Sequence, residues 1–294
     1  MQRQIARPRS STIRAVFDCV SRHKPKLGQN FLRDAQAAAR IVSALGDLTG
    51  RTVIEIGPGQ GAITAMLATA AAHVVAIEVD RQLAAELRQS FSAERVSVVE
   101  QDVLQFDFAA AAQQAGMRLR VAGNLPYYIT SPILLHLAAS HAALDAAVLM
   151  VQREVAERVT AQPGSRDYGV LSVTAQAYGP AEPLFTLPPA AFSPPPEVYS
   201  TVFRWRFAPR FTALGVEESA FLRLARASFA QKRKTLANNL RAAGIASEAA
   251  TAAMAAAGID RLARAETLSL ETLAALCRHL VSGSAIPGTE PSAH

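Results

Sequence analysis

Cysteine and long apolar runs are nearly absent from this sequence. Its 294 residues include two cysteines, Cys19 and Cys277, which lie near opposite ends and fit no zinc-ligand spacing. We therefore expect a reducing compartment and no structural metal. No apolar stretch reaches the length of a membrane-spanning helix, so a membrane protein is not expected. The predicted location is the cytoplasm, or an organelle if the Arg-rich start is a transit peptide.

Acidic residues are scarce in two segments that are rich in Lys and Arg. Between Met1 and Arg33, eight basic residues stand against one acid, whereas the whole chain has a net charge of +6. The second segment has no acid and contains Arg223, Arg226, Lys232, Arg233, Lys234 and Arg241. Such concentrated charge is typical of a protein that binds a polyanion, and a solvated helix face with a free arm is the alternative.

The body of the chain alternates between strand and helix patterns. Predicted strands cover residues 52–56, 73–78, 95–100, 119–122 and 146–151, and predicted helices cover 63–70, 80–91 and 131–139. Apolar strands separated by helices predict an α/β fold with a doubly wound, Rossmann-like parallel sheet.

The C-terminal third has a different composition. Residues 179–200 are dense in proline and are expected to form an ordered loop, and residues 198–207 alternate as an edge strand would. After Pro209 the chain is rich in alanine, with predicted helices at 221–230, 232–243, 247–256 and 269–280. We expect four parts: a basic, disordered arm (1–22), a sheet domain (23–208), a helical domain (209–281) and a disordered tail (282–294).

A glycine-rich turn, Glu55-Ile56-Gly57-Pro58-Gly59-Gln60-Gly61, follows the first predicted strand. Its G-x-G-x-G spacing differs from the dinucleotide fingerprint G-x-G-x-x-G, so a ligand without a pyrophosphate is favoured. Glu78 ends the second strand, where a carboxylate can accept both ribose hydroxyls, and Asp102 follows the third, where it can accept an adenine amino group. These positions predict a nucleoside cofactor site such as that for S-adenosylmethionine (SAM). A plain strand-to-helix turn is the alternative.

The tetrapeptide Asn124-Leu125-Pro126-Tyr127 follows the fourth strand, at the same edge of the sheet. The Asn124 side-chain oxygen and the Leu125 carbonyl, held by Pro126, can both accept hydrogen bonds from one amino group of a flipped-out base. Tyr127 offers a ring for stacking. Phe192 is a candidate for the other face of the base, with a place in the hydrophobic core as the alternative.

Together these motifs resemble the small-subunit ribosomal RNA adenine N6-dimethyltransferases of the KsgA/RsmA type, over residues 23–280. The resemblance rests on motifs that match in order: Lys26-Leu27-Gly28-Gln29-Asn30-Phe31-Leu32, Glu55 to Gly61, Glu78, Asp102, Asn124 to Tyr127, Phe192-Ser193-Pro194-Pro195-Pro196 and residues 228–236. It implies that Asn30, Leu32, Gly57, Gly59, Glu78, Asp102 and Asn124 contact SAM, and that Lys232, Arg233 and Lys234 contact RNA.

The resemblance also implies a function. The expected reaction is dimethylation of two adjacent adenosines in a hairpin near the 3′ end of 16S ribosomal RNA, in a pre-30S-type particle, by a monomer that needs no metal. Glu197 and Tyr199 depart from the family pattern, where many relatives carry Lys and Asp, and Tyr128 stands where some members have Asn. Three alternatives are a large-subunit dimethyltransferase of the macrolide-resistance type, a DNA adenine methyltransferase and a non-catalytic assembly or transcription factor.

Overall fold

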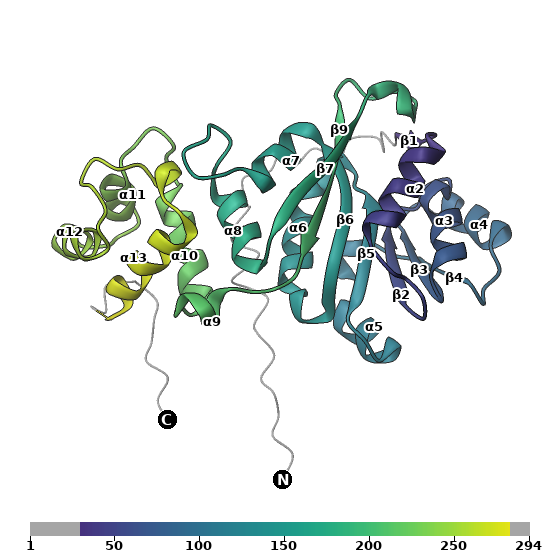
Figure 1. The fold of residues 1–294 in the computed structure, drawn as a ribbon, viewed down its shortest axis with the longest axis horizontal. Helices are drawn as coiled ribbons and strands as arrows, with labels where there is room; N and C mark the ends of the chain where they lie inside the picture. The colour runs from purple at the N-terminus through teal and green to yellow at the C-terminus, as the bar shows by residue number, and fades with distance from the viewer. Residues whose placement is uncertain (1–29, 283–294) are drawn as a thin grey trace, which may run out of the picture.

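A seven-stranded sheet forms the centre of the computed structural model, which describes residues 30–282 (Figure 1). The predictions for residues 1–29 and 283–294 lie outside this range. The strands are β2 (Thr52–Ile56), β3 (His73–Glu78), β4 (Val96–Glu100), β5 (Leu119–Asn124), β6 (Leu144–Gln152), β7 (Ala181–Leu187) and β9 (Ser200–Arg206).

The spatial order of the strands is β4-β3-β2-β5-β6-β9-β7. The five strands from β4 to β6 are parallel, and β9 runs antiparallel to both of its neighbours. The chain moves outward from β2 to β4 and then returns to place β5 on the other side of β2. Ligands of open parallel sheets bind at such a reversal, beyond the carboxyl ends of the strands. The doubly wound α/β fold is confirmed.

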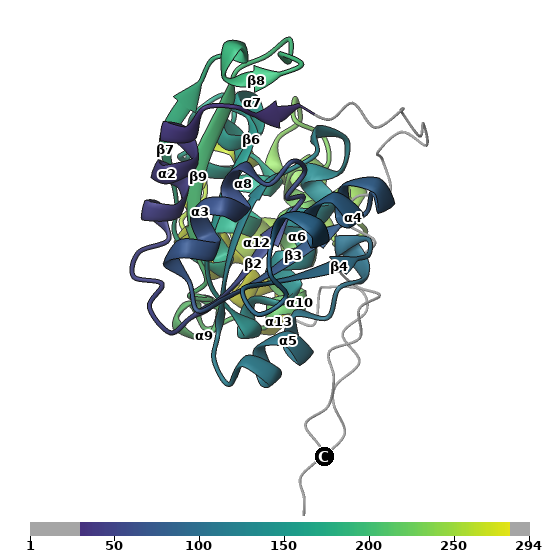
Figure 2. The same cartoon turned by 90° about the vertical axis from the view of Figure 1, so that its right-hand side faces the viewer.

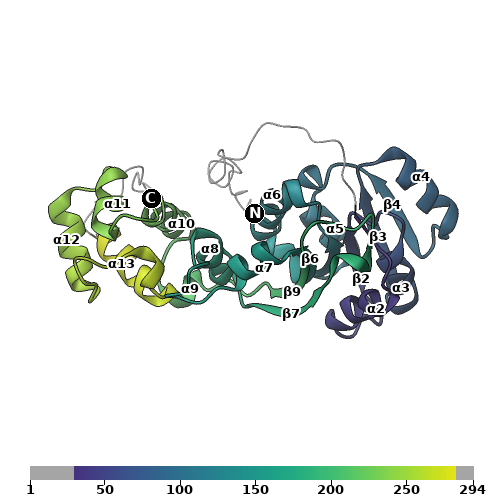
Figure 3. The same cartoon turned by 90° about the horizontal axis from the view of Figure 1, so that it is seen from above.

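Helices cover both faces of the sheet (Figure 3). They are α2 (Ala35–Ala44), α3 (Ala62–Ala70), α4 (Arg81–Ser90), α5 (Phe108–Ala115), α6 (Thr130–Ala139), α7 (Arg153–Thr160) and α8 (Val170–Tyr178). Successive strand residues point to opposite faces, so Val53 packs in the core beneath α2 and α3, whereas Ile54 packs in the core beneath α5 and α6.

Carboxylate caps set the beginnings of three of these helices. Asp34 accepts hydrogen bonds from the backbone N–H groups of Gln36 and Ala37, and Asp80 accepts them from Gln82 and Leu83. Asp107 caps α5 in the same way. A cap satisfies N–H groups that have no partner in the helix, and its negative charge suits the helix N-terminus.

The proline-rich segment departs from its prediction. Residues 179–200 contain β7, and β9 lies between β6 and β7 instead of at the edge of the sheet. Pro183 lies in β7 beside an irregularity in its pairing with β9. An edge strand can tolerate a proline because one side of it makes no ladder bonds. The expected loop is therefore wrong for residues 181–187.

The chain after β9 is helical, and its helices gather at one end of the molecule (Figure 1). They are α9 (Phe211–Leu214), α10 (Glu218–Ser228), α11 (Leu236–Ala242), α12 (Ser247–Ala256) and α13 (Leu270–Ser282). Phe211 packs edge-on against Tyr178 of α8, with ring centroids 5.2 Å apart. The change from strands to helices falls close to the predicted boundary at residue 209. The division into separate domains stays a prediction.

One predicted helix begins later than expected. The prediction began at Lys232, but α11 begins at Leu236 because the Thr235 hydroxyl caps it by accepting from the Asn238 N–H. Lys232, Arg233 and Lys234 consequently lie in the turn between α10 and α11.

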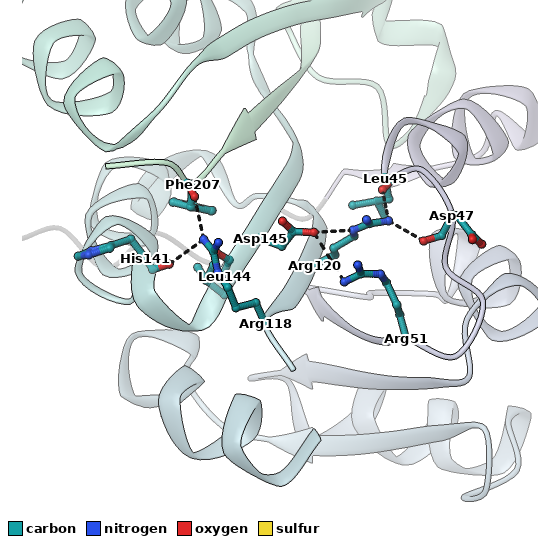
Figure 4. A network of polar contacts seen from close by, with 9 residues as sticks. All are labelled: Leu45, Asp47, Arg51, Arg118, Arg120, His141, Leu144, Asp145 and Phe207. Atoms are coloured by element: carbon teal, nitrogen blue, oxygen red, sulfur yellow. Dashed lines mark hydrogen bonds and ion pairs between the residues drawn. The ribbon is translucent and has the colours of Figure 1, made fainter. Parts of the chain in front are cut away.

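A polar network holds the amino ends of the central strands, opposite the edge where ligands are expected (Figure 4). Arg120 of β5 donates from Nε to Asp145 Oδ2 at 3.0 Å and from Nη1 to the carbonyls of Leu45 at 2.7 Å and Asp47 at 2.6 Å. Arg118 donates to the carbonyls of His141, Leu144 and Phe207. These bonds join β5 to the loop after α2 and to β6.

Replacing Arg120 by methionine should lower the free energy of unfolding by about 2 kcal/mol, because the partly buried carbonyl of Leu45 would lose its donor and the ion pair with Asp145 would be lost. Urea unfolding measures this loss. The matched control is Arg158→Met, which removes an exposed ion pair with Glu154 one helical turn away and should cost about 0.5 kcal/mol or less. Equal losses of unfolding free energy in the two variants would show that the Arg120 network stabilises the protein no more than an exposed ion pair does.

Candidate active site

A cavity of about 180 Å³ opens at the carboxyl ends of β2, β3 and β5, where the strand order reverses. The predicted cofactor and target-base residues that line it are Asn30, Gly57, Gly59, Glu78, Asp102, Asn124, Leu125, Pro126 and Tyr127. The cavity is also lined by residues that were not predicted as site residues, among them Phe31, Ile77, Val79, Gln101, Val103, Leu104, Tyr128, Ile129 and Ile133. The fold thus brings both motifs to one cavity.

The turn after β2 requires glycine for conformational reasons. Gly57, Gly59 and Gly61 have φ angles of +64°, +55° and +84°, a region that other residues rarely adopt. A Cβ atom on Gly59 would also lie 2.9 Å from Cδ1 of Phe31. The glycine at position 59 therefore allows the backbone and the Phe31 ring to form one wall of the cavity.

The Glu78 carboxylate is fixed at the end of β3. Its Oε2 accepts from the Gly59 N–H at 3.1 Å, and its Oε1 accepts from the Asp80 N–H at 3.0 Å. The side chain is 3% exposed and borders the cavity. Each carboxylate oxygen has a second lone pair, so both can still accept from a pair of hydroxyl groups on a ligand.

Asp102 is positioned by a short 3₁₀ turn, η1 (Val103–Gln105). One carboxylate oxygen, Oδ1, caps this turn by accepting from the Leu104 N–H at 2.9 Å. The other oxygen can accept from an amino group. The apolar side chains of Ile77, Val103 and Leu104 line the same part of the cavity. This combination suits a flat heterocycle that carries an exocyclic amine.

The Asn124 side chain is held in a defined orientation. Its Nδ2 donates to the backbone carbonyl of Asn30 at 2.9 Å, which leaves Oδ1 as an acceptor on a residue that lines the cavity. The Leu125 N–H donates to the Met150 carbonyl at 2.9 Å, and the Pro126 carbonyl accepts from the Thr130 hydroxyl at 2.9 Å. The tetrapeptide backbone is therefore fixed on both sides of the Leu125 carbonyl.

Two tyrosines, Tyr127 at the end of this tetrapeptide and Tyr128 directly after it, line the cavity. The Tyr127 hydroxyl forms a hydrogen bond with Ser200 Oγ at 2.9 Å, and burial raises the pKa of Tyr127. The pKa of Tyr128 is raised by burial and by the nearby Asp102 and Glu78 carboxylates. Both phenols are therefore neutral at physiological pH, and their rings are available for stacking.

Leu32 and Phe192 are placed together but away from the cavity. They are paired residues in the small antiparallel sheet of β1 (Phe31–Leu32) and β8 (Phe192–Ser193), which lies near the top of Figure 2. Both belong to the core beneath α2 and α3, with exposures of 6% and 4%. Phe192 thus takes the core position that the sequence left open. Strand alternation directs Phe31, the neighbour of Leu32, to the cavity instead.

The predicted RNA contacts lie outside the cavity, in the exposed turn between α10 and α11. Asn239, which is 2% exposed, holds this turn by donating to the carbonyls of Ser228 at 2.7 Å and Gln231 at 3.2 Å. Lys232 donates to the Arg166 carbonyl at 2.7 Å. The role of Asn239 could not be predicted from the sequence, because a buried polar side chain is recognisable only once its hydrogen-bond partners are placed.

A metal site and a membrane-spanning helix are both absent from the described residues. Within residues 30–282, no group of three or more His, Cys, Asp or Glu side chains is arranged to hold a metal ion. None of the helices in this part of the chain combines the length and apolar character needed to cross a bilayer.

Comparison with known proteins identifies the family of this chain. The profile of the family described as "Ribosomal RNA adenine dimethylase" matches residues 20–280. A relative from Acidobacterium capsulatum, named ribosomal RNA small subunit methyltransferase A, is 57% identical over 93% of this chain and 95% of its own length. A relative of the same name from Koribacter versatilis is 49% identical over 88% of this chain and 95% of its own length.

Solved structures of similar fold agree with the family match. The 23S rRNA methyltransferase ErmE is 26% identical, with a TM-score of 0.67, and the similarity covers 86% of this chain and 100% of that protein. A dimethyladenosine transferase from Plasmodium falciparum has a TM-score of 0.70 and covers 87% of this chain and 98% of its own. At 21% identity, that second likeness concerns the fold alone.

Glu55 gives the site a pH-dependent element. It lies in β2 just before the glycine turn, is 1% exposed, and its Oε2 has no hydrogen-bond partner. Burial raises the pKa of Glu55 from 4.5 to about 7, the neighbouring Thr64 opposes this, and the Glu78 charge adds to it. The folded state thus holds the Glu55 proton more tightly than the unfolded chain does.

The Glu55→Gln variant should reveal this effect in unfolding experiments. The stability that Glu55 contributes is complete below pH 4.5 and is lost as the pH rises through about 7. Relative to the variant, the free energy of unfolding of the native protein should fall by roughly 3 kcal/mol between pH 4.5 and about 7. Glu94→Gln, a change at an exposed residue, is the control. If the free energy of unfolding changed with pH in the same way in the native protein and in Glu55→Gln, Glu55 would not be a buried titrating carboxyl.

Proposed function

The chain belongs to the ribosomal RNA adenine dimethylase family, and on this premise we propose that it dimethylates N6 of two adjacent adenosines in small-subunit (16S) ribosomal RNA. The enzyme is a SAM-dependent methyltransferase whose substrate is ribosomal RNA. The proposed target is a hairpin near the 3′ end of the RNA, modified during ribosome biogenesis. We further propose that the enzyme acts as a cytoplasmic monomer on a pre-30S-type particle.

The residues around the cavity fit SAM. Glu78 keeps free lone pairs for the ribose hydroxyls, and Asp102 keeps one oxygen for the adenine amino group. The glycine turn brings backbone to the cavity wall without side chains, and Asn30 lines the same wall. When bound, SAM supplies an electrophilic methyl group on a positively charged sulfur.

The orientation of Asn124 is the observation that carries the proposal. The lone pair of an adenine amino group is delocalised into the ring, so N6 is a poor nucleophile. Asn124 Oδ1 and the Leu125 carbonyl would accept one hydrogen bond each from N6, favour a pyramidal nitrogen and hold it in place. The same two oxygens stabilise the positive charge that develops on N6. The proton that N6 loses can pass to water, so no side-chain base is required.

The choice of the small subunit rests on the relatives. Two relatives at 57% and 49% identity carry the name small subunit methyltransferase A, whereas ErmE, named for 23S rRNA, is 26% identical. Primer extension on both ribosomal subunits tests the choice. Strong stops at adjacent adenosines of 16S rRNA support it, and modification confined to 23S rRNA overturns it. Methylation of duplex DNA without methylation of rRNA would establish the DNA alternative.

Replacing Asn124 by alanine should reduce kcat for RNA methylation by at least about a hundredfold, because one of the two proposed acceptors for N6 is lost. The dissociation constant for SAM, measured by calorimetry, should change by less than about threefold, since Glu78 and Asp102 remain. Asn238→Ala, at an exposed asparagine of α11, is the control. Near-normal turnover by Asn124→Ala would mean that the amine acceptor is assigned wrongly.

The basic turn should contribute to RNA affinity through its charge. Replacing Lys232, Arg233 and Lys234 together by alanine should lower the slope of log affinity against log salt by roughly 2, because fewer counterions are released from the RNA. Filter binding across a range of salt concentrations measures this slope, and SAM affinity should stay constant. The control is Arg206→Ala, which removes an exposed charge at the end of β9 that lies away from the cavity. An unchanged slope in the triple variant would mean that this turn is a solvated surface that makes no charge contact with RNA.

A further inference from the structure

Exposed apolar side chains gather around the mouth of the cavity. Among residues 30–282, the large hydrophobic side chains with high exposure are Val79, Tyr128, Val198, Tyr199, Leu262 and Val281. Val79 and Tyr128 line the cavity itself. Val198 and Tyr199 immediately precede Ser200, whose hydroxyl bonds to Tyr127 at the cavity wall. Such a concentration of exposed apolar groups marks a surface that binds something.

Tyr199 is the best positioned of these side chains for a specific contact. It is 48% exposed, and the Arg153 guanidinium lies 5.6 Å from the centre of its ring. The Arg153 N–H also donates to the Tyr199 carbonyl at 2.9 Å, so the backbones of the two residues are tied together. Arg153 forms an exposed ion pair with Glu157 at 3.4 Å. The pair therefore presents a large, accessible ring beside a fixed positive charge.

The strand register places this pair at the same edge as the target-base motif. Asn124 ends β5 opposite Met150 of β6, and Arg153 directly follows β6. Ser200, next to Tyr199, begins β9 opposite Gln152 of β6. Two strand spacings of about 4.8 Å and three residues of about 3.3 Å along the strands put the backbone of Tyr199 roughly 14 Å from that of Asn124. A strand of duplex DNA rises about 3.4 Å per nucleotide. An unstacked RNA strand extends further per nucleotide, so a nucleotide close to the target adenosine can reach the Tyr199 ring.

We propose that Tyr199 and Arg153 form a stacking platform for an unpaired base that flanks the target adenosine. This inference rests on the proposed function and names a substrate contact for it. Aromatic rings and guanidinium groups are the surfaces on which proteins stack unpaired RNA bases. Glu157 contacts Arg153 and Glu197 lies two residues before Tyr199, so the local charge disfavours a phosphate. A base, which is neutral and flat, is the part of RNA that fits here.

The exposed ring of Tyr199 offers apolar area that a flanking base can cover, because 48% of the residue is accessible to solvent. Burial of that area would contribute to RNA affinity.

The test uses the fluorescent base 2-aminopurine, which is quenched when it stacks. A 16S-type hairpin oligonucleotide carries it either at the target position or next to it. On the wild-type protein we expect quenching of the flanking probe, and on Tyr199→Ala we expect most of it to be lost. The KM for RNA should rise about tenfold, within the range for loss of one stacked base, with kcat and SAM affinity unchanged. Tyr199→Phe keeps the ring and should behave as wild type.

The control and the contradicting outcomes separate this inference from the proposed function. Leu262→Ala removes an exposed apolar side chain of the helical region and should change neither the KM for RNA nor the quenching of the flanking probe. A Tyr199→Ala enzyme that methylates RNA with unchanged KM and unchanged flanking quenching overturns the platform and leaves the proposed function intact. Wild-type protein that fails to methylate 16S rRNA overturns the proposed function instead. An effect of Tyr199→Ala on binding to the particle but not to the hairpin would assign the surface to a ribosomal protein and overturn the platform.

Discussion

The hydrogen bond from Asn124 Nδ2 to the Asn30 carbonyl is the interaction on which the proposed chemistry depends. An amide side chain can present either its oxygen or its NH2 group, and only the oxygen can accept from an adenine amine. The bond joins two segments far apart in the sequence at the reversal of the strand order. It forms only when both segments are in place, so the orientation of the acceptor depends on the fold.

The rest of the structure can be understood as support for that orientation. Arg120 anchors the start of β5 to Asp145 and to the loop after α2, and Asn124 is the last residue of the same strand. The β1–β8 ladder holds the segment that follows Asn30, because Leu32 pairs with Phe192 in the core. Leu32 and Phe192, which contribute no side chain to the cavity, thus position residues that do.

Sequence patterns predicted the elements whose signal is local. The first two strands have the predicted bounds, as does α12, because apolar runs and helix periodicity determine them. The motif residues that follow the parallel strands also line one cavity, since parallel strands end at a common edge. Features that depend on tertiary neighbours were not predictable: β7 contains a proline tolerated only at an edge, and the basic turn is held by the buried Asn239. Phe192 was predicted to face the target base, with a core position as the alternative, and its pairing with Leu32 places it in the core.

A structure of the complex with S-adenosylhomocysteine and an RNA hairpin would test the central claim most directly. The quantity to measure is the distance from the target N6 to Asn124 Oδ1 and to the Leu125 carbonyl oxygen. We expect both distances to fall within hydrogen-bonding range, about 2.7–3.2 Å, with N6 facing the sulfur of the cofactor product. A target adenine that lies in another cleft, or that turns its amine away from Asn124, would contradict the account.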